Sequence, residues 1–557
     1  MTTKQVVVLG APGRGGYRQL EVGTGEPVRL RTDLGGSVPS PRLRSLLAFV
    51  QLSDLHVTDV QSPTRAEFLD RSVDEEGTQV RAGTYRPQQA LSCQVVEAAA
   101  RTVRALSGGP AAGAPLAFAI STGDAADNGQ RNELVAYLAL LDGGREVVPD
   151  SGDPERYEGV DVSDPYDTGY WHPDGTPPGQ PDDLARARRG FPEVAGLHQA
   201  CRKPFVATGL GLPWYAVYGN HDALLAGAVP PVAALVSRAV SGDKLSLLDL
   251  ETDVVDLLIA TETEPQIDFW LRAGCRTRPV TSDPARRPVQ AQEWIAAHRE
   301  LPGEPCGHGF DAEAAASGRA YYRIDSGMVS CLILDTVNRA GGWQGSLDAD
   351  QFRCLESELV AGHGHYYDAS GEDVWASASD RLFILASHHP LECFVNAYPP
   401  DGPPRVLRDE VQLMLARFPN VVLWVNGHTH MHTIVPFPAG HGKGRATGFW
   451  QVTTSSLIDW PQQARSIELA VDETTGDLVI TAVAVDHSGR VNPAGQSLDD
   501  IDVLAGWSRE LAANAWQRRR IPSEPDGQGT ADDRNVALVV PAPFPLTGAR
   551  RLESGSS

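Results

Sequence analysis

Apolar residues along the chain gather in short runs that end at polar residues, a pattern typical of buried strands. These runs span residues 47–52, 116–121, 214–218, 329–335, 382–386 and 421–425. Between several of them, apolar residues recur at helical spacing, over residues 87–106, 132–141, 348–360 and 407–418. This alternation predicts an α/β protein whose functional groups lie at the carboxyl ends of its strands.

The pattern changes toward the end of the chain. Residues 448–456, 466–471 and 478–485 alternate in the manner of antiparallel strands, and we expect them to close a second sheet. Residues 1–43 are expected to form an N-terminal extension, and residues 491–557 a C-terminal helix with a polar tail. The main domain is therefore predicted to span residues 44–490.

Two long segments interrupt the alternation. Residues 143–211 are rich in Pro, Gly and Asp, and residues 223–319 combine helical stretches with loops. Because both lie directly between polar motifs, we expect them to shape a substrate site. The alternative is that they add packing without touching a substrate.

Composition narrows the classes of partner. A net charge of −23 argues against a broad basic surface for nucleic acid. A small phosphate ester stays compatible, because bound metal cations would reverse the potential locally. The seven cysteines never form CxxC, so neither a disulfide framework nor a zinc ribbon is expected. No apolar run approaches the roughly 18 residues of a membrane span, and no signal-like stretch is found, so the sequence predicts a cytoplasmic protein.

Five polar fragments follow strand-like runs. They are Asp54-Leu55-His56, Gly123-Asp124, Gly219-Asn220-His221-Asp222, His388-His389-Pro390 and Gly427-His428-Thr429-His430. Carboxylate and imidazole side chains are suitable ligands for Mn, Fe or Zn. Two such cations about 3.5–4 Å apart activate water and neutralise a phosphoryl group. The fragments therefore predict a site for two divalent metal ions, and the two oxygens of Asp124 suit a bridging ligand.

Taken together, the fragments resemble the calcineurin-like metallophosphoesterase superfamily, whose pattern is DxH, GDxxD/N, GNHD/E, a lone His, and GHxH. The resemblance covers about 30 residues, spread from position 54 to position 430. The long segments between the motifs resemble those of a bacterial subgroup, some members of which carry an export signal. The resemblance implies an α/β fold in the form of a four-layer α/β/β/α metallophosphoesterase sandwich with large insertions.

The resemblance also implies two sets of metal ligands. Asp54, His56 and His430 would hold one metal ion. Asn220, His388 and His428 would hold the other, and Asp124 would bridge the two. His388 is preferred to His389 because the family ligand is followed, one residue later, by Pro.

Two further residues receive catalytic roles from the resemblance. His221 would stabilise the transition state or protonate the leaving group, and Asp222 would orient it. In the purple acid phosphatase branch, a Tyr three residues after the bridging Asp binds ferric iron. Asp127 occupies that place here, so a purple iron centre is not expected.

Several other residues are open to more than one interpretation. His432 either contacts the site or has a structural role, and Asn128 is expected to hydrogen-bond near the site. His363 and His365 are expected to be solvated. For the fragment Tyr170-Trp171-His172, packing at the surface is favoured over stacking on a substrate. GAPGRGG at residues 10–16 lacks the Lys-Ser/Thr of a phosphate-binding loop, and Thr454-Ser455-Ser456 lacks a GxSxG context.

The favoured function is hydrolysis of small soluble phosphate esters, by a hydroxide that bridges two metal ions. Mono- and diesters are not distinguished, and the sequence does not indicate the oligomeric state. The alternatives are a non-catalytic metal- or phosphate-binding protein on the same fold, or a nuclease.

Overall fold

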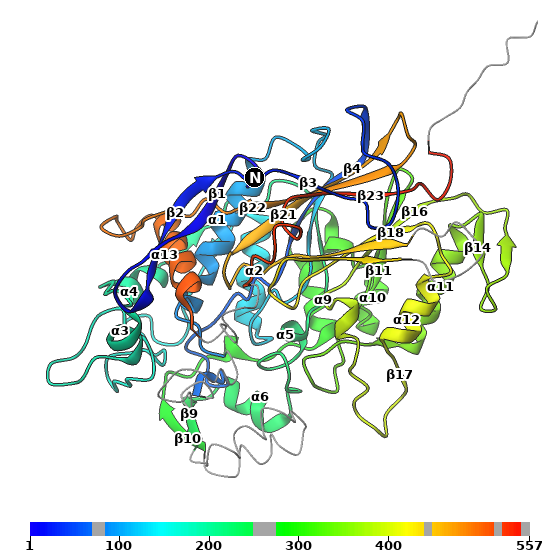
Figure 1. Ribbon diagram of the computed structural model, residues 1–557. Coiled ribbons are helices and arrows are strands. Elements are labelled where there is room, and N and C mark those ends of the chain that lie inside the picture. Colours follow the sequence, from blue (N-terminus) through cyan, green and yellow to red (C-terminus); the bar gives the residue numbers. More distant parts are fainter. Residues whose placement is uncertain (69–83, 249–274, 439–447, 517–525, 547–557) are drawn as a thin grey trace, which may run out of the picture.

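The computed structural model describes residues 1–68, 84–248, 275–438, 448–516 and 526–546 (Figure 1). It is a mixed α/β structure in which two large sheets hold the principal strands. The seven-stranded sheet has the order β3 (Arg29–Arg31), β23 (Val536–Val540), β22 (Leu478–Asp486), β21 (Gln463–Asp472), β4 (Leu43–Leu52), β5 (Phe118–Ser121) and β8 (Trp214–Ala216). The six-stranded sheet has the order β11 (Tyr322–Ser326), β12 (Val329–Ile333), β16 (Leu382–Ala386), β18 (Val421–Asn426), β20 (Phe449–Thr453) and β19 (Thr433–Phe437).

The six apolar runs are confirmed as strands, and they fall into two parallel groups. Strands β4, β5 and β8 run parallel in one sheet, and β12, β16 and β18 run parallel in the other. Parallel neighbours end at the same edge of a sheet, so each group presents its carboxyl ends together. The four predicted helices are also confirmed, as α1 (Ser92–Arg104), α2 (Arg131–Asp142), α11 (Ala349–Ala361) and α12 (Arg408–Leu415).

The three late runs are strands as expected, but they do not close a second sheet together. Strand β20 lies in the six-stranded sheet, parallel to β18 and antiparallel to β19. Strands β21 and β22 are antiparallel, but β21 pairs with β4 and so extends the sheet that holds β5 and β8. Alternation along one strand describes its two faces and leaves its neighbours undetermined, which is why the assignment failed.

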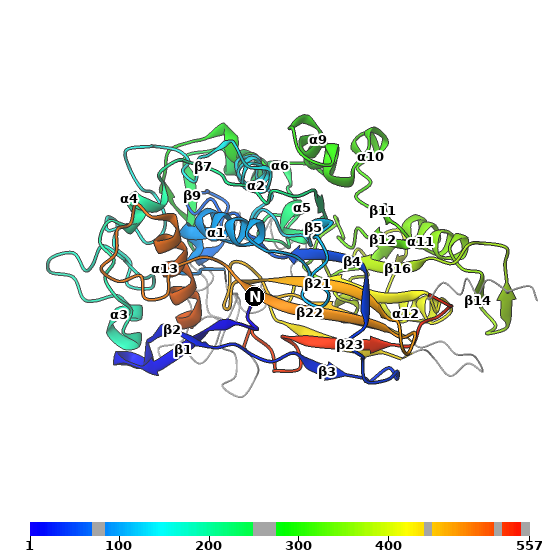
Figure 2. The same ribbon diagram turned by 90° about the horizontal axis from the view of Figure 1, so that it is seen from above.

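Alternate side chains of the central strands enter different clusters of the core. On β16, Leu382, Ile384 and Ala386 join a cluster that also contains Phe49 of β4 and Phe118 of β5. The intervening β16 residues pack instead against α11 and α12. On β4, Val50 and Leu52 face α1 and α2. The two sheets therefore meet across one shared core, with helices on their other faces (Figure 2).

Both ends of the described chain contribute to the seven-stranded sheet. Strand β23, in the segment expected to be a polar tail, pairs with β22 on one side and with β3 on the other. The expected C-terminal helix is α13 (Ile501–Asn514), which packs against α1. The hairpin of β1 (Gln5–Pro12) and β2 (Arg18–Thr24) lies beside α13 at the left of Figure 1.

The two long inserted segments carry short elements of their own. The first holds β6 (Glu146–Val147), α3 (Leu184–Arg189), α4 (Leu197–Cys201) and β7 (Phe205–Val206). The second holds α6 (Ala233–Ala239), β9 (Asp243–Leu248), β10 (Cys275–Pro279), α9 (Ala291–Glu300) and α10 (Ala312–Ser317). Tyr170, Trp171 and His172 lie buried in the first segment, so the expectation of surface packing is wrong. The ring of Tyr170 packs against Tyr85 and that of Trp171 against Phe191, whereas the His172 ring lies 4.3 Å from that of Tyr166.

Two small two-stranded sheets are formed by segments that connect strands of the six-stranded sheet. Strand β13 (Leu347–Asp348) pairs with β17 (Arg405–Val406), and β14 (His365–Tyr367) pairs with β15 (Asp373–Trp375) in a hairpin at the right of Figure 1. The expectation of a solvated His363 is wrong, because its ring is buried and its Nδ1 lies 2.5 Å from the Leu359 carbonyl.

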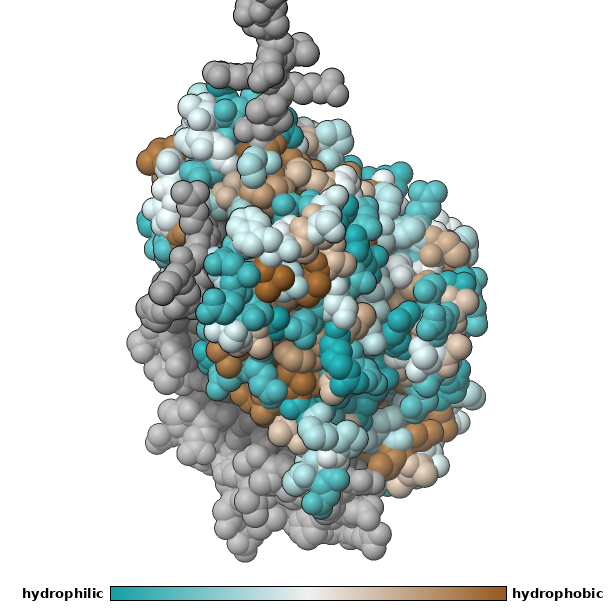
Figure 3. Space-filling view, turned by 90° about the vertical axis from the view of Figure 1, so that its right-hand side faces the viewer, coloured by the Kyte–Doolittle hydropathy of each residue, from teal (hydrophilic) through white to brown (hydrophobic). Residues whose placement is uncertain are grey.

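Viewed from the right-hand side of Figure 1, the surface is largely hydrophilic with scattered small apolar areas (Figure 3). No helix of the described residues combines the length and the hydropathy that a bilayer crossing requires.

Candidate metal centre

The carboxyl ends of β4, β5, β8, β16 and β18 meet where the two sheets come together. Asp54 follows β4 and His428 follows β18, and the His428 backbone N–H donates to both carboxylate oxygens of Asp54 at 3.0 and 3.1 Å. Ligand atoms of the predicted site lie within 4.8 Å of one another in overlapping groups of three. These groups are Asp54, His56 and His430; Asp54, Asp124 and His388; His56, Asp124 and His221; and His388, His389 and His428.

The first predicted ligand set, Asp54, His56 and His430, forms a tight group. The Nε2 atoms of His56 and His430 are 3.1 Å apart, and His430 Nε2 is 3.2 Å from Asp54 Oδ1. His56 Nδ1 donates to Asp127 at 2.9 Å, and His430 Nδ1 donates to Asp459 at 2.6 Å. With the Nδ1 hydrogen of each imidazole directed to a carboxylate, both Nε2 atoms would be free to act as metal ligands. A cation placed between them could be coordinated by both rings and by Asp54.

Asp124 lies between the two predicted sets. Its Oδ2 is 3.1 Å from His388 Nε2 and 3.7 Å from His56 Nε2. His388 Nδ1 donates to the Thr122 carbonyl at 2.9 Å, and His388 Nε2 is 3.2 Å from His428 Nδ1. One carboxylate oxygen therefore faces imidazoles of both sets, as a bridging ligand must.

Asn220, at the start of the short helix α5 (Asn220–Ala223), is the residue that best tests the fit of a metal ion. Its Nδ2 donates to the Gly227 carbonyl at 2.8 Å, which directs Oδ1 away from that loop. Oδ1 is buried and accepts no hydrogen bond from the described residues. An unpaired buried acceptor is costly. A cation bound there would satisfy it, so the donor set fits the predicted ligand role.

The comparisons with known proteins add nothing to this geometry. No protein-family model matches the chain, and no curated protein matches it either. The assignment of the site therefore depends on its own residues.

The charge of the site favours a bound cation. Burial opposes ionisation of Asp54 and Asp124, yet the adjacent imidazoles of His430 and His388 lower the pKa of both carboxyls. Within the described residues, neither carboxylate forms an ion pair with Lys or Arg. Burial would lower the pKa of His388, but Asp124 and Asp54 outweigh it and raise that pKa to about 9. A buried imidazole that holds a proton so strongly lies in a field that attracts positive charge.

Strained backbone coincides with the predicted ligands. Nine non-glycine residues of the described chain have positive φ, and five of them are predicted ligands. These five are Asp54, His56, Asp124, His428 and His430, with φ between 44° and 69°. Such conformations cost free energy and concentrate at functional sites, where the surrounding structure enforces them.

Glycines beside the ligands allow the segments to approach closely. Gly123 has a φ of 89°, and a Cβ there would lie 2.5 Å from His388 Nδ1. A Cβ on Gly427 would collide with Ser53 Oγ and with the Asp54 carboxylate. A side chain at either position would therefore push the ligand-bearing segments apart.

His221 lies at the site, but Asp222 does not hold its ring as expected. His221 Nδ1 donates to the Asp127 backbone carbonyl at 2.6 Å. The Asp222 carboxylate accepts instead from the backbone N–H groups of Gly219, Ala125 and Ala126, at 2.9 to 3.0 Å. Burial and the charge of Asp124 raise the pKa of Asp222 to about 7. Asp222 therefore fastens the segment after β5 to the segment after β8, and the expected role in orienting the ring falls to a carbonyl.

The structure separates the residues that the sequence left ambiguous. His389 is bonded at both ring nitrogens, to Thr336 Oγ1 at 2.7 Å and to the Trp343 carbonyl at 3.1 Å, which supports His388 as the ligand. His432 has a structural role, because its ring contacts Arg465 at 2.7 Å and Gln463 at 3.0 Å. Asn128 accepts from the Ala226 N–H at 2.6 Å, in the loop that follows the GNHD fragment.

Two orienting residues were missed at the level of sequence. Asp459, which follows β20, accepts a hydrogen bond from His430, as Asp127 does from His56. Arg86 lies between these two carboxylates. The Arg86 guanidinium lies 3.2 Å from Asp459 and 3.7 Å from Asp127. A carboxylate that accepts from a ligand imidazole fixes the ring and raises its basicity. In the sequence, Asp459 could have been recognised as an acidic residue in the loop that follows a strand-like run. Arg86 has no comparable position in the sequence pattern.

Asp459→Asn is expected to weaken metal binding about 10- to 100-fold, because an amide oxygen is a poorer acceptor for His430 Nδ1. Metal affinity measured by competition with a chelator checks the change. Asp499→Asn is the matched control, since Asp499 is a surface carboxylate paired with Lys203. Equal metal affinity in both variants would show that Asp459 does not support the centre.

Proposed function

We propose that this protein hydrolyses small phosphate esters with two divalent metal ions, as a member of the calcineurin-like metallophosphoesterase superfamily. The observation that carries the proposal is the position of Asp124 Oδ2 between His388 and His56. The unsatisfied Oδ1 of Asn220 belongs to the same site, because the adjacent His221 donates its backbone N–H to Asp124 Oδ1 at 2.8 Å. Asp54, His56 and His430 would hold one ion, and Asn220, His388 and His428 the other, with Asp124 shared. Mn, Fe and Zn all suit these donors.

The fold supports the same proposal. Helices, the seven-stranded sheet, the six-stranded sheet and a second set of helices follow one another through three core clusters. This order supports the four-layer α/β/β/α sandwich that the sequence resemblance implies. The ligand-bearing segments follow strand ends of both sheets, where functional groups of such folds are expected.

The metal ions, when bound, would activate water and neutralise the phosphoryl charge. The protein's own residues would position the reactants. Asp127 holds both His56, through its carboxylate, and His221, through its backbone carbonyl. Because His221 Nδ1 is held in this way, its Nε2 is the atom that would donate a proton to the leaving oxygen. The described residues provide no hydrogen-bond partner for that Nε2.

The second inserted segment closes against this site. Gly227 contacts Asn220 through its carbonyl, and a Cβ on Gly227 would collide with the His221 ring. Residues 224–229 therefore form a wall of the centre, which supports a part for this segment in shaping the substrate site. The first segment contacts the loop after β4 instead, where Gln61 Nε2 donates to the Ser151 carbonyl at 2.8 Å.

Small esters are favoured as substrates over nucleic acid. The net charge of −23 would repel a polyanion, whereas a small ester interacts chiefly with the metal ions. The competing function is a non-catalytic metal- or phosphate-binding protein. A protein that only binds metal or phosphate would not need a proton donor. The placement of His221 beside the ligands therefore favours catalysis.

Removal and return of metal tests the proposal. Protein treated with a chelator is expected to lose hydrolysis of aryl phosphate mono- and diesters, and separate additions of Mn, Fe and Zn are expected to restore it to different extents. Metal content, determined alongside turnover, should approach about two ions per chain. Two bound ions without turnover of any ester would instead identify a binding protein.

A further inference from the structure

Trp343 lies against the predicted metal centre and is half exposed. Its ring stacks on that of His428, with centroids 5.7 Å apart and planes inclined by 24°. The residue keeps 49% of its surface exposed. By contrast, Trp171, Trp214, Trp294, Trp424 and Trp450 are fully buried. Exposing so large an apolar side chain forgoes the free energy of burial, and such exposure beside a site indicates a binding role.

The loop that carries Trp343 is held firmly. The carbonyl of Trp343 accepts from His389, and the carbonyls on either side, of Gly341 and Gln344, accept from Asn396 Nδ2 at 2.9 Å. The Gly342 N–H donates to the Ala228 carbonyl at 2.8 Å. The loop is thereby tied to the wall that also holds Asn220. An aromatic surface fixed in advance binds a ligand at a low entropic cost.

We propose that Trp343 determines substrate specificity by stacking on a flat, unsaturated substituent of the phosphate ester, such as an aryl group or a nucleobase. The inference rests on the proposed function, because it requires a phosphoryl group held at the adjacent centre. A ring bound there would lie over the exposed part of Trp343 while its phosphoryl group reaches the metal ions.

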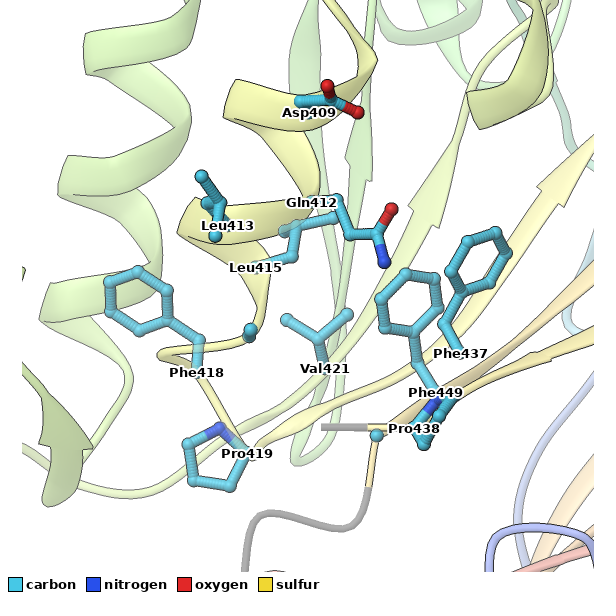
Figure 4. A pocket seen from close by; sticks show the side chains of 12 residues that line it. Asp409, Gln412, Leu413, Leu415, Phe418, Pro419, Val421, Phe437, Pro438 and Phe449 are labelled. Atoms are coloured by element: carbon cyan, nitrogen blue, oxygen red, sulfur yellow. The ribbon is translucent and has the colours of Figure 1, made fainter. Parts of the chain in front are cut away.

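The geometry favours stacking on a bound ring over a merely protective role for Trp343. A side chain that only shielded His428 would bury its own surface as well, yet half of this one remains exposed. A hollow of about 400 Å³ beneath α12 is lined by Leu413, Phe418, Phe437 and Phe449 (Figure 4). Its lining offers one carboxylate, Asp409, and no cationic group, so it is unsuited to a phosphate ester.

Binding of three phosphonates of equal charge to the zinc-loaded protein tests the inference. Phenylphosphonate presents a flat ring, cyclohexylphosphonate an apolar ring that is not flat, and methylphosphonate neither. Calorimetry is expected to show phenylphosphonate binding about tenfold more tightly than the other two, a preference within the usual range for stacking. In Trp343→Leu the ratio of the affinity for phenylphosphonate to that for the other two compounds should fall to near one. In Trp343→Phe part of this preference should remain.

The matched control is Trp375→Leu. Trp375 is exposed on the β14–β15 hairpin, well away from α5 in Figures 1 and 2, and its substitution should leave the preference unchanged. Equal binding of the phenyl and cyclohexyl compounds would overturn the inference while leaving phosphoryl binding established. Equal weakening of all three compounds in Trp343→Leu would also overturn it, because Trp343 would then support the centre itself. Failure of the unmodified protein to bind any of the three would contradict the proposed function, and the inference with it.

Discussion

Asp124→Asn is expected to remove bound metal and to reduce phosphate ester hydrolysis to background. The carboxylate is buried, and its Oδ2 faces imidazoles of both predicted sets, His388 at 3.1 Å and His56 at 3.7 Å. An amide oxygen keeps the size of the side chain but not its charge, and one neutral oxygen cannot hold two cations together. Metal content after gel filtration is expected to fall from about two ions per chain to fewer than one.

The isosteric substitution also protects the fold. Asp124 Oδ1 accepts the His221 backbone N–H at 2.8 Å, and the amide oxygen of Asn can do the same. Circular dichroism should therefore be unchanged, and Asp499→Asn again serves as the surface control. Retention of both ions by Asp124→Asn would refute the bridging role.

His221→Ala is expected to keep both metal ions and to lose turnover by about 10²- to 10⁴-fold, the usual effect of a missing proton donor. The His221 ring lies 4.5 Å from the His56 ring, and its Nδ1 is held by the Asp127 carbonyl. Steady-state kinetics and metal analysis of the same preparation check both halves of the expectation. His365→Ala, on the β14–β15 hairpin, is the control.

Leaving groups of different basicity sharpen this test. A nitrophenolate departs without a proton, whereas an alkoxide needs one, so His221→Ala should impair alkyl esters far more than nitrophenyl esters. An equal loss for both classes would assign His221 to binding or to the support of the centre, and full activity would exclude any role in the reaction.

The sequence predicted the central strands well, because their physical signal is local. A run such as 382–386 is buried on both faces between helices and the other sheet, so it is apolar throughout and coincides with β16. The partners of the late strands were not predictable in this way. Strands β20 and β21 follow each other along the chain, yet β20 joins β18 and β21 joins β4. The pairing of β21 with β4 joins segments hundreds of residues apart, so no local pattern indicates it.

The same distinction applies to the site. Asp54, His56, Asp124, Asn220, His388, His428 and His430 were selected from short motifs, and the structure brings all of them together. The groups that support them came only from the three-dimensional structure. Asp459 and Arg86 have no motif of their own, and the placement of Trp343 depends on the hydrogen bond from His389 to its carbonyl. Asp222 was given the wrong contact because adjacency in sequence does not specify where a side chain points.

The separation of the ligands along the chain has a consequence for biosynthesis. A polypeptide synthesised as far as Asn220 already contains Asp54, His56 and Asp124 as well, but neither ligand set is complete before His428 and His430 have been made. Strand β23, at Val536–Val540, must also be added between β22 and β3 before the seven-stranded sheet is whole. Contacts so distant in sequence form late and slowly. Metal insertion would thus follow translation of most of the chain, and a ribosome-bound intermediate would compete poorly for the ions.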